Sequence, residues 1–181
     1  MLEHLYPQVE RVITATTRPP RPGESHTHHY HFLSEADFLN KIKNNEFYEY
    51  AVVHNYYYGS LKTDIQSKLN QNIDLLLNID VQGVETFKKT SQADPLLKSR
   101  LVTIFIMPPN IDELHSRLQN RNQDSSEEIS KRLQIAKEEM RSWKTYNYCI
   151  PSHSKEEDFV ALLSIYSAEK LKIRNTDNRT L

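Results

Sequence analysis

The chain has 181 residues, enough for one domain of ordinary size, with 26% charged residues and a formal net charge of −1. This near-neutral balance argues against nucleic acid or a membrane surface as the main partner, and no apolar run reaches the length of a membrane span. Cys149 is the only cysteine, which excludes an intrachain disulfide in the printed chain, so we expect a reducing, cytoplasmic setting.

The first half of the chain predicts short strands between amphipathic helices. A β-branched run over 11–16 predicts a strand, and Ser34 begins a helix with a capping-box pattern. Short, tyrosine-rich, alternating segments between residues 24 and 60 predict small strands. Apolar residues spaced four apart predict a helix over 61–69, and a compact apolar run over 73–79 predicts a buried parallel strand.

The second half of the chain alternates compact apolar runs with helical patterns, as parallel strands covered on both faces require. The predicted elements are a strand over 101–107, a helix capped by Asn110, a longer helix with an apolar stripe (Ile129, Leu133, Ala136, Met140 and Trp143), a strand over 146–150, a closing helix over 159–166 and a polar tail over 174–181. The order of elements predicts an α/β core without an internal linker.

Residues 14–24 read Thr-Ala-Thr-Thr-Arg-Pro-Pro-Arg-Pro-Gly-Glu. Arg18 and Arg21 lie on a backbone stiffened by three prolines and follow three threonine hydroxyls. A guanidinium presents a planar fork that matches a phosphate, so the segment predicts a surface directed at an oxyanion. The alternative is a proline-rich surface turn with solvated arginines.

Further motifs give this segment a family context. Residues 14–24 resemble the phosphate-gripping segment of the guanylate kinase family, and four other motifs recur in family order. These are Asn-Asn-Glu-Phe-Tyr-Glu-Tyr at 44–50, Tyr-Tyr-Gly-Ser at 57–60, Ile-Asp-Val-Gln-Gly at 79–83 and Pro-Pro at 108–109. The resemblance implies a P-loop-kinase-like parallel sheet flanked by helices. It also implies one domain over 1–173, with a small mixed β acceptor-nucleotide subdomain at about 25–60 and a helical lid at about 111–132.

The resemblance also implies an acceptor site for GMP. The matching residues are Thr14, Arg18, Arg21, Tyr30, Glu49, Tyr58, Ser60 and Asp80. Guanine presents adjacent N1–H and N2–H donors, and the Glu49 carboxylate can accept both, whereas adenine lacks that pair. The two tyrosine hydroxyls suit a phosphate that the arginines already hold. Without the resemblance, the pattern favours a partly buried tyrosine cluster with a surface glutamate.

Asp80 ends an apolar strand in the manner of a Walker B aspartate that acts near Mg²⁺, although no residue is expected to bind the metal directly. Asp80 can also cap a helix that begins at Val81, and the two roles are compatible. Asn78 departs from the family, which usually has an acidic residue at this position. An amide accepts with one oxygen where a carboxylate has two, so the change weakens contacts either to the acceptor base or to metal-bound water.

By resemblance, Arg117, Arg121 and Arg132 belong to the lid and supply catalytic charge during transfer from ATP. The spacing alone favours helix-surface arginines that pair with Glu113 or Glu128.

The donor side is less complete. The printed sequence contains three glycines and no GxxxxGK[ST] string, and residues 1–7 resemble the end of the helix that follows this loop in the family. Residues 151–153 read Pro-Ser-His where the family usually has Asn-Asp. We therefore expect the donor-phosphate loop to be absent from the chain as given. Two hypotheses stay open: a guanylate kinase that uses ATP, GMP and Mg²⁺, and a catalytically dead module that binds GMP or a phosphorylated partner.

Histidines at 28, 29 and 31 invite interpretation as a metal site, but no second ligand cluster accompanies them at zinc-finger spacing. We interpret this segment as a solvated histidine-rich loop.

Overall fold

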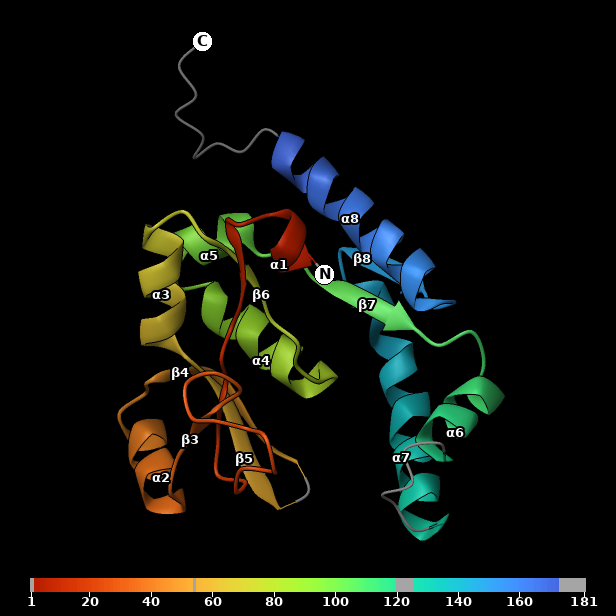
Figure 1. The fold of residues 1–181 in the computed structure, drawn as a ribbon, viewed down its shortest axis with the longest axis horizontal. Helices are drawn as coiled ribbons and strands as arrows, with labels where there is room; N and C mark the ends of the chain where they lie inside the picture. The colour runs from red at the N-terminus through yellow and green to blue at the C-terminus, as the bar shows by residue number, and fades with distance from the viewer. Residues whose placement is uncertain (1, 54, 120–125, 173–181) are drawn as a thin grey trace. The chain divides into compact units, whose positions relative to one another are not determined.

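The structure is a computed structural model that describes residues 2–53, 55–119 and 126–172. The chain divides into two compact units, residues 1–101 and 102–181. Each unit combines helices with short strands, and both contain a parallel strand pair, as the predicted α/β class requires (Figure 1). The tail predicted over 174–181 lies outside the described residues.

A four-stranded mixed sheet lies in the first unit. Its strands are β2 (Ala15–Thr16), β3 (His31–Phe32), β4 (Phe47–Val53) and β5 (Tyr56–Leu61), in the order β3-β2-β5-β4. The β2–β3 pair is parallel and the other two pairs are antiparallel. The small mixed sheet predicted from the tyrosine-rich segment is therefore present, and β2 extends it to residue 15.

Three successive side chains are buried beside a β-bulge in β4. The register shifts between Phe47 and Glu49, and Phe47, Tyr48 and Glu49 are all buried. Phe47 joins one hydrophobic core with Phe38, whereas Tyr48 joins another core. Because successive side chains of a strand point to opposite faces, β4 contributes to two cores and also buries Glu49.

Helix α2 (Glu35–Lys43) packs on this sheet and begins as predicted. The Ser34 hydroxyl accepts a hydrogen bond from the Asp37 N–H at 3.1 Å. The buried face of α2 carries Phe38, whose ring stacks on the Phe47 ring with 4.5 Å between the ring centroids. The apolar stripe of α2 thus closes the smaller core.

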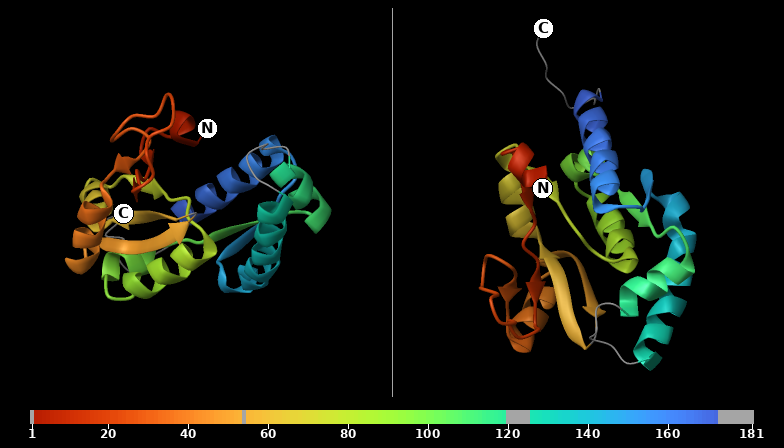
Figure 2. Two further views of the ribbon diagram at one scale, coloured as in Figure 1. Left: turned by 90° about the horizontal axis from the view of Figure 1, so that it is seen from below. Right: turned by 45° about the vertical axis from the view of Figure 1, so that its right-hand side comes forward.

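The rest of the first unit surrounds a parallel pair, β1 (Val9–Arg11) and β6 (Asp74–Leu76). The helices are α1 (Leu2–Leu5), α3 (Lys62–Asn70), α4 (Val81–Ser91) and α5 (Pro95–Arg100). Their shared core contains Val12, Ile65, Phe87 and Leu97. Helix α4 packs against β4, and Figure 2 shows it lying along the β4–β5 strands. This contact places the start of α4 next to the part of β4 that carries Glu49.

The second unit contains a parallel pair, β7 (Ile104–Met107) and β8 (Tyr148–Pro151). Its helices are α6 (Ile111–Gln119), α7 (Ser126–Glu139), a 3₁₀ helix over Met140–Thr145 (η1) and α8 (Lys155–Leu171). As predicted, Asn110 caps α6, because its Oδ1 accepts from the Glu113 N–H at 2.7 Å. The predicted longer helix is divided, because α7 ends at Glu139 and the chain continues as the 3₁₀ helix, where Trp143, the last residue of the predicted apolar stripe, is 41% exposed. Helices α6 and α7 contact each other, and α8 packs on β8 (Figure 2).

No helix among the described residues is both long and apolar enough to cross a membrane.

Candidate functional site

A cleft of about 340 Å³ opens on the first unit, between the mixed sheet and the start of α4. Five residues predicted to bind the acceptor line it: Thr14, Tyr30, Glu49, Tyr58 and Asp80. Asn78, the departure noted in the sequence, lines it as well. The folded chain therefore brings together side chains that are separated by up to 66 positions in the sequence.

Glu49 and Ser60 form the buried end of the cleft. Glu49 is 4% exposed, Ser60 is fully buried, and the Ser60 hydroxyl donates to Glu49 Oε1 at 2.5 Å. Burial raises the pKa of Glu49, the hydrogen bond from Ser60 lowers it, and the negative charge of Asp80 raises it again, for a net increase. A carboxylate held this way has one oxygen oriented by the protein and gains from further N–H donors.

Helix α4 begins beside this carboxylate. Asp80 is its N-cap as predicted, with Oδ1 accepting from the Gly83 N–H at 2.7 Å. A Cβ at position 83 would lie 3.1 Å from both Asp80 Oδ1 and Glu49 Oε2. A glycine there lets two carboxylates approach the helix N-terminus, whose partial positive charge offsets part of their repulsion.

Arg18, which was also predicted to bind the acceptor, is not among the residues that line the cleft. Its Nη2 lies 2.9 Å from both carboxylate oxygens of Glu24, and its Nη1 donates to the Pro19 carbonyl at 2.8 Å. The guanidinium carbon lies 5.5 Å from the centre of the Tyr30 ring and 5.8 Å from that of Phe32. Burial lowers the pKa of Arg18, but hydrogen bonding and charge from Glu24 and Tyr58 more than reverse this. Arg18 thus lies against the Tyr30 ring and is influenced electrostatically by Tyr58, and both tyrosines line the cleft.

A tight turn carries the second arginine. The Glu24 N–H donates to the Arg21 carbonyl at 3.0 Å, and Gly23 has φ of +85°. Proline at the second position and a left-handed glycine at the third are the residues that a type II turn requires. Arg21 itself is exposed.

The three threonine hydroxyls that precede the arginines lie in different surroundings. Thr16 Oγ1 accepts from the Arg18 N–H at 3.2 Å, and Thr17 Oγ1 accepts from the Tyr57 N–H at 3.0 Å. These two hydroxyls satisfy the backbone where the chain leaves β2. Of the three, Thr14 is the one that lines the cleft.

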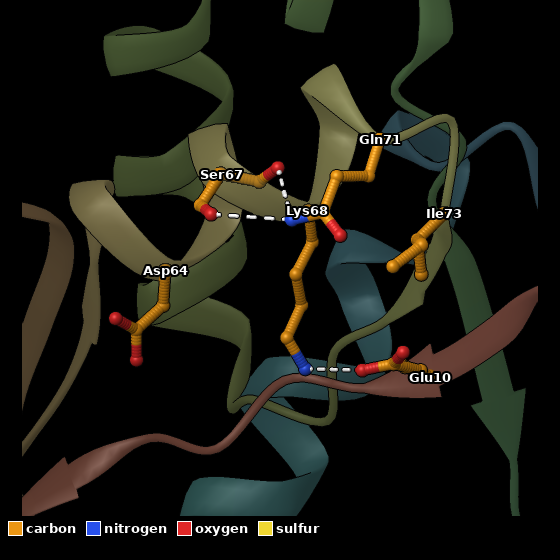
Figure 3. A pocket seen from close by; sticks show the side chains of 6 residues that line it. All are labelled: Glu10, Asp64, Ser67, Lys68, Gln71 and Ile73. Carbon is orange, nitrogen blue, oxygen red and sulfur yellow. Dashed lines mark hydrogen bonds and ion pairs between the residues drawn. The ribbon is translucent and has the colours of Figure 1, made fainter.

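A second hollow, of about 270 Å³, lies beside α3 and is shown in Figure 3. Lys68 extends from α3 to Glu10 on β1, where Nζ and Oε2 are 2.5 Å apart. Asp64, on the same helix, pairs with His31 Nε2 at 2.7 Å. The Lys68–Glu10 ion pair and the His31–Asp64 hydrogen bond engage these side chains with one another, so we interpret this hollow as structural.

The predicted solvated histidine loop is confirmed for His28 and His29 but not for His31, which lies on β3, is partly buried and contacts Asp64. His28 and His29 are exposed, and His29 Nδ1 accepts from the Ser25 N–H at 3.1 Å. No group of three or more potential metal ligands occurs among the residues that the structure describes.

Comparison with known proteins agrees with this geometry. The guanylate kinase family model matches residues 1–169. The chain belongs to the guanylate kinase family.

Among curated guanylate kinases, the protein of Bartonella henselae is 39% identical over 165 residues, which cover 91% of this chain and 72% of that protein. The guanylate kinase of Buchnera aphidicola subsp. Schizaphis graminum is 40% identical over 167 residues, 92% of this chain and 77% of that protein. The crystal structure of guanylate kinase from Anaplasma phagocytophilum superposes with a TM-score of 0.76 at 27% identity. The superposition covers 97% of this chain and 84% of the Anaplasma phagocytophilum chain.

The predicted catalytic arginines lie in the part of this guanylate kinase family member that follows residue 101. Arg117 is on α6 and Arg132 is on α7. Arg121 lies outside the described residues. Their roles therefore stay predictions.

Two features of the site were missed from the sequence. Glu24 appeared in the motif but was not assigned a role, because an acid beside phosphate-directed arginines has no obvious function in a linear pattern. Gly83 also lacked a role, and only its proximity to Glu49 and Asp80 shows why the position is small. The available clue to the position of Glu24 was the Pro22-Gly23 pair, which favours a type II turn just before it.

Proposed function

We propose that this chain binds GMP in the cleft as the phosphoryl acceptor, and that the buried Glu49–Ser60 pair recognises guanine. The observation that carries the proposal is a carboxylate 4% exposed, oriented on one oxygen by a fully buried hydroxyl. Guanine offers N1–H and N2–H side by side, whereas adenine offers an unprotonated N1 at the corresponding edge. A site built to receive such donors rejects a base that lacks them, because its buried acceptor is left unpaired.

The polar part of the site suits the phosphate of the same nucleotide. Arg18 lies against the Tyr30 ring and is influenced electrostatically by Tyr58, and both tyrosines line the cleft that Glu49 closes. Arg21 lies three residues further along the stiff turn. Hydrogen bonds from a guanidinium to a phosphate monoester are charge-assisted and stronger than neutral ones. Tyrosine hydroxyls can donate further hydrogen bonds to the remaining phosphate oxygens. We assign Arg18, Arg21, Tyr30 and Tyr58 to this phosphate.

The reaction that fits family membership is transfer of the γ-phosphoryl group from ATP to GMP. We assign Arg117, Arg121 and Arg132 to charge neutralisation during transfer, within a lid at about 111–132. We propose that residues 25–60 form the acceptor subdomain. We also propose a cytoplasmic location, as the composition predicts. Such transfer depends on positioning and charge, so the acceptor residues contribute by fixing the phosphate in place.

Mg²⁺ is the metal that this reaction uses, and the described residues fit a limited role for the protein in holding it. Mg²⁺ keeps several waters and needs only one or two protein carboxylates beside the substrate phosphates. Asp80, which lines the cleft and already accepts from Gly83, would hold the ion through water. When bound, Mg²⁺ neutralises charge on the transferring phosphates.

The test compares GMP with AMP by calorimetric titration of the 181-residue chain, followed by an assay for GDP formation with ATP and Mg²⁺. We expect GMP to bind at least tenfold more tightly than AMP, because AMP leaves Glu49 unpaired. Equal affinities would contradict the assignment of the base site. GMP-selective binding without GDP formation would support the binding-module hypothesis instead of the kinase.

A further inference from the structure

Glu24 connects both arginines of the proline-rich turn. Its two carboxylate oxygens accept from Arg18 Nη2, each at 2.9 Å, and Oε2 also accepts from the Arg21 backbone N–H at 2.7 Å. The Arg18 and Glu24 side chains are 10% and 18% exposed, well below a typical surface ion pair. One carboxylate therefore fixes the side chain of the first arginine and the backbone of the second.

The turn geometry makes this contact possible. Gly23, at φ of +85°, reverses the chain so that Glu24 returns toward Arg18, six positions earlier. The backbone N–H of Arg21 lowers the pKa of Glu24 most, burial opposes this, and Arg18 lowers it further, for a net decrease. Glu24 is thus held as an anion by the same groups that it orders.

We propose that Glu24 is a positioning residue for the acceptor phosphate: it holds the Arg18 guanidinium against Tyr30 and near Tyr58, so that a phosphate meets an ordered cation with an N–H donor still available. This inference rests on the proposed function. Glu24 is added to the proposed GMP site as a residue that orders Arg18 without contacting the ligand.

Competition between Glu24 and a phosphate for Arg18 is the opposite expectation, and the contacts argue against it. A guanidinium carries five N–H donors, and Glu24 engages Nη2 while the Pro19 carbonyl engages Nη1. Donors remain for the Tyr58 hydroxyl and an incoming phosphate. A long side chain that is already ordered loses less entropy on binding, so the ion pair favours the bound state.

The test uses Glu24→Gln, which keeps the shape of the side chain and removes its charge. Glu46→Gln is the matched control, because Glu46 forms an ion pair with Lys41 at 2.8 Å in the same unit but away from the turn. For each protein, the dissociation constants for GMP and for guanosine are measured by calorimetry, and the midpoint of thermal unfolding is recorded. The ratio of the two constants isolates the phosphate contribution from effects on the base or the fold.

We expect Glu24→Gln to weaken GMP binding by roughly three- to tenfold and to leave guanosine binding unchanged. Glu46→Gln should change neither constant. In an Arg18→Ala background, Glu24→Gln should have no further effect on GMP, because Glu24 acts through Arg18. Guanosine binding provides a readout that a general loss of structure would move and a positioning role would not.

Three results would overturn the inference. Tighter GMP binding by Glu24→Gln would show competition, and equal weakening of GMP and guanosine would show a structural role. An effect of the same size in the Arg18→Ala background would show that Glu24 acts by another route. If the unaltered chain binds neither GMP nor guanosine, the proposed function fails and this inference fails with it. If Glu24→Gln binds GMP and its ratio of the GMP and guanosine dissociation constants equals that of the unaltered chain, this inference fails while the proposed function stands.

Discussion

The two ends of the proposed GMP site hold their functional side chains by different means. At the base end, Glu49 and Ser60 lie on β4 and β5, buried and joined to each other. At the proposed phosphate end, Arg18 and Arg21 do not line the cleft itself but lie on a turn that an ion pair and a left-handed glycine hold in shape. Burial makes an unsatisfied acceptor costly and therefore selective, whereas a stiff turn presents charge without removing it from water. If the proposed function holds, the sheet supplies selectivity for the base and the turn supplies attraction for the phosphate.

The largest effect that separates the two ends is expected from Arg18→Ala. Removing a charge-assisted contact to phosphate should weaken GMP binding about a hundredfold, since each such bond contributes roughly 1.5–3 kcal/mol. Guanosine has no phosphate, so its affinity should stay within twofold. Calorimetric titration of both ligands measures the difference, and parallel losses for the two would mean that the ends are not independent.

The sheet should be less tolerant of an added methyl group than the turn. A Cβ at Gly59 would lie 2.9 Å from Phe47 Cδ1 and 3.0 Å from the Glu49 carbonyl oxygen. Because the backbone of β4 cannot yield easily, we expect Gly59→Ala to lower the free energy of unfolding by about 2 kcal/mol. Urea denaturation provides the measurement.

Gly23→Ala is the counterpart in the turn. No heavy atom outside the neighbouring residues lies within 4 Å of the added Cβ, but the backbone is at φ of +85°. Left-handed backbone costs alanine about 1 kcal/mol, so this change should destabilise the chain by about half as much as Gly59→Ala. A larger loss at Gly23 than at Gly59 would contradict the view that the sheet is the more constrained region.

A smaller, pH-dependent effect should mark the base end alone. Burial raises the pKa of Glu49, and guanine N–H groups favour its ionised form, so acid should weaken binding. Guanosine affinity should fall as pH drops through a value above the ordinary one of about 4.3, approaching tenfold per pH unit below it. Guanosine is the ligand of choice because a phosphate titrates near pH 6 by itself. If Glu49→Gln shows the same decline, another group is responsible.

Local patterns predicted the features that depend on few neighbours. The caps at Ser34, Asp80 and Asn110 follow from short-range hydrogen bonding, and all three are present. The parallel strand pairs and the small mixed sheet also agree with the sequence prediction.

What the sequence could not supply depends on register and on distant neighbours. Three successive side chains are buried at Phe47–Glu49, where β4 has a bulge, and no alternating pattern indicates this. The Thr17 hydroxyl accepts from the Tyr57 N–H, forty positions away, and this contact is visible only once Tyr57 is placed beside it. The end of α7 at Glu139 reflects packing rather than the apolar period, which continues beyond it.

The central claim is that Glu49 reads the paired donors of guanine, and titration of GMP and IMP against the unaltered chain and Glu49→Gln tests it most directly. IMP keeps the phosphate and N1–H but lacks the N2 amine. The account predicts that the unaltered chain prefers GMP over IMP by about tenfold, and that Glu49→Gln weakens GMP binding and removes most of this preference. An undiminished preference for GMP in Glu49→Gln would contradict it.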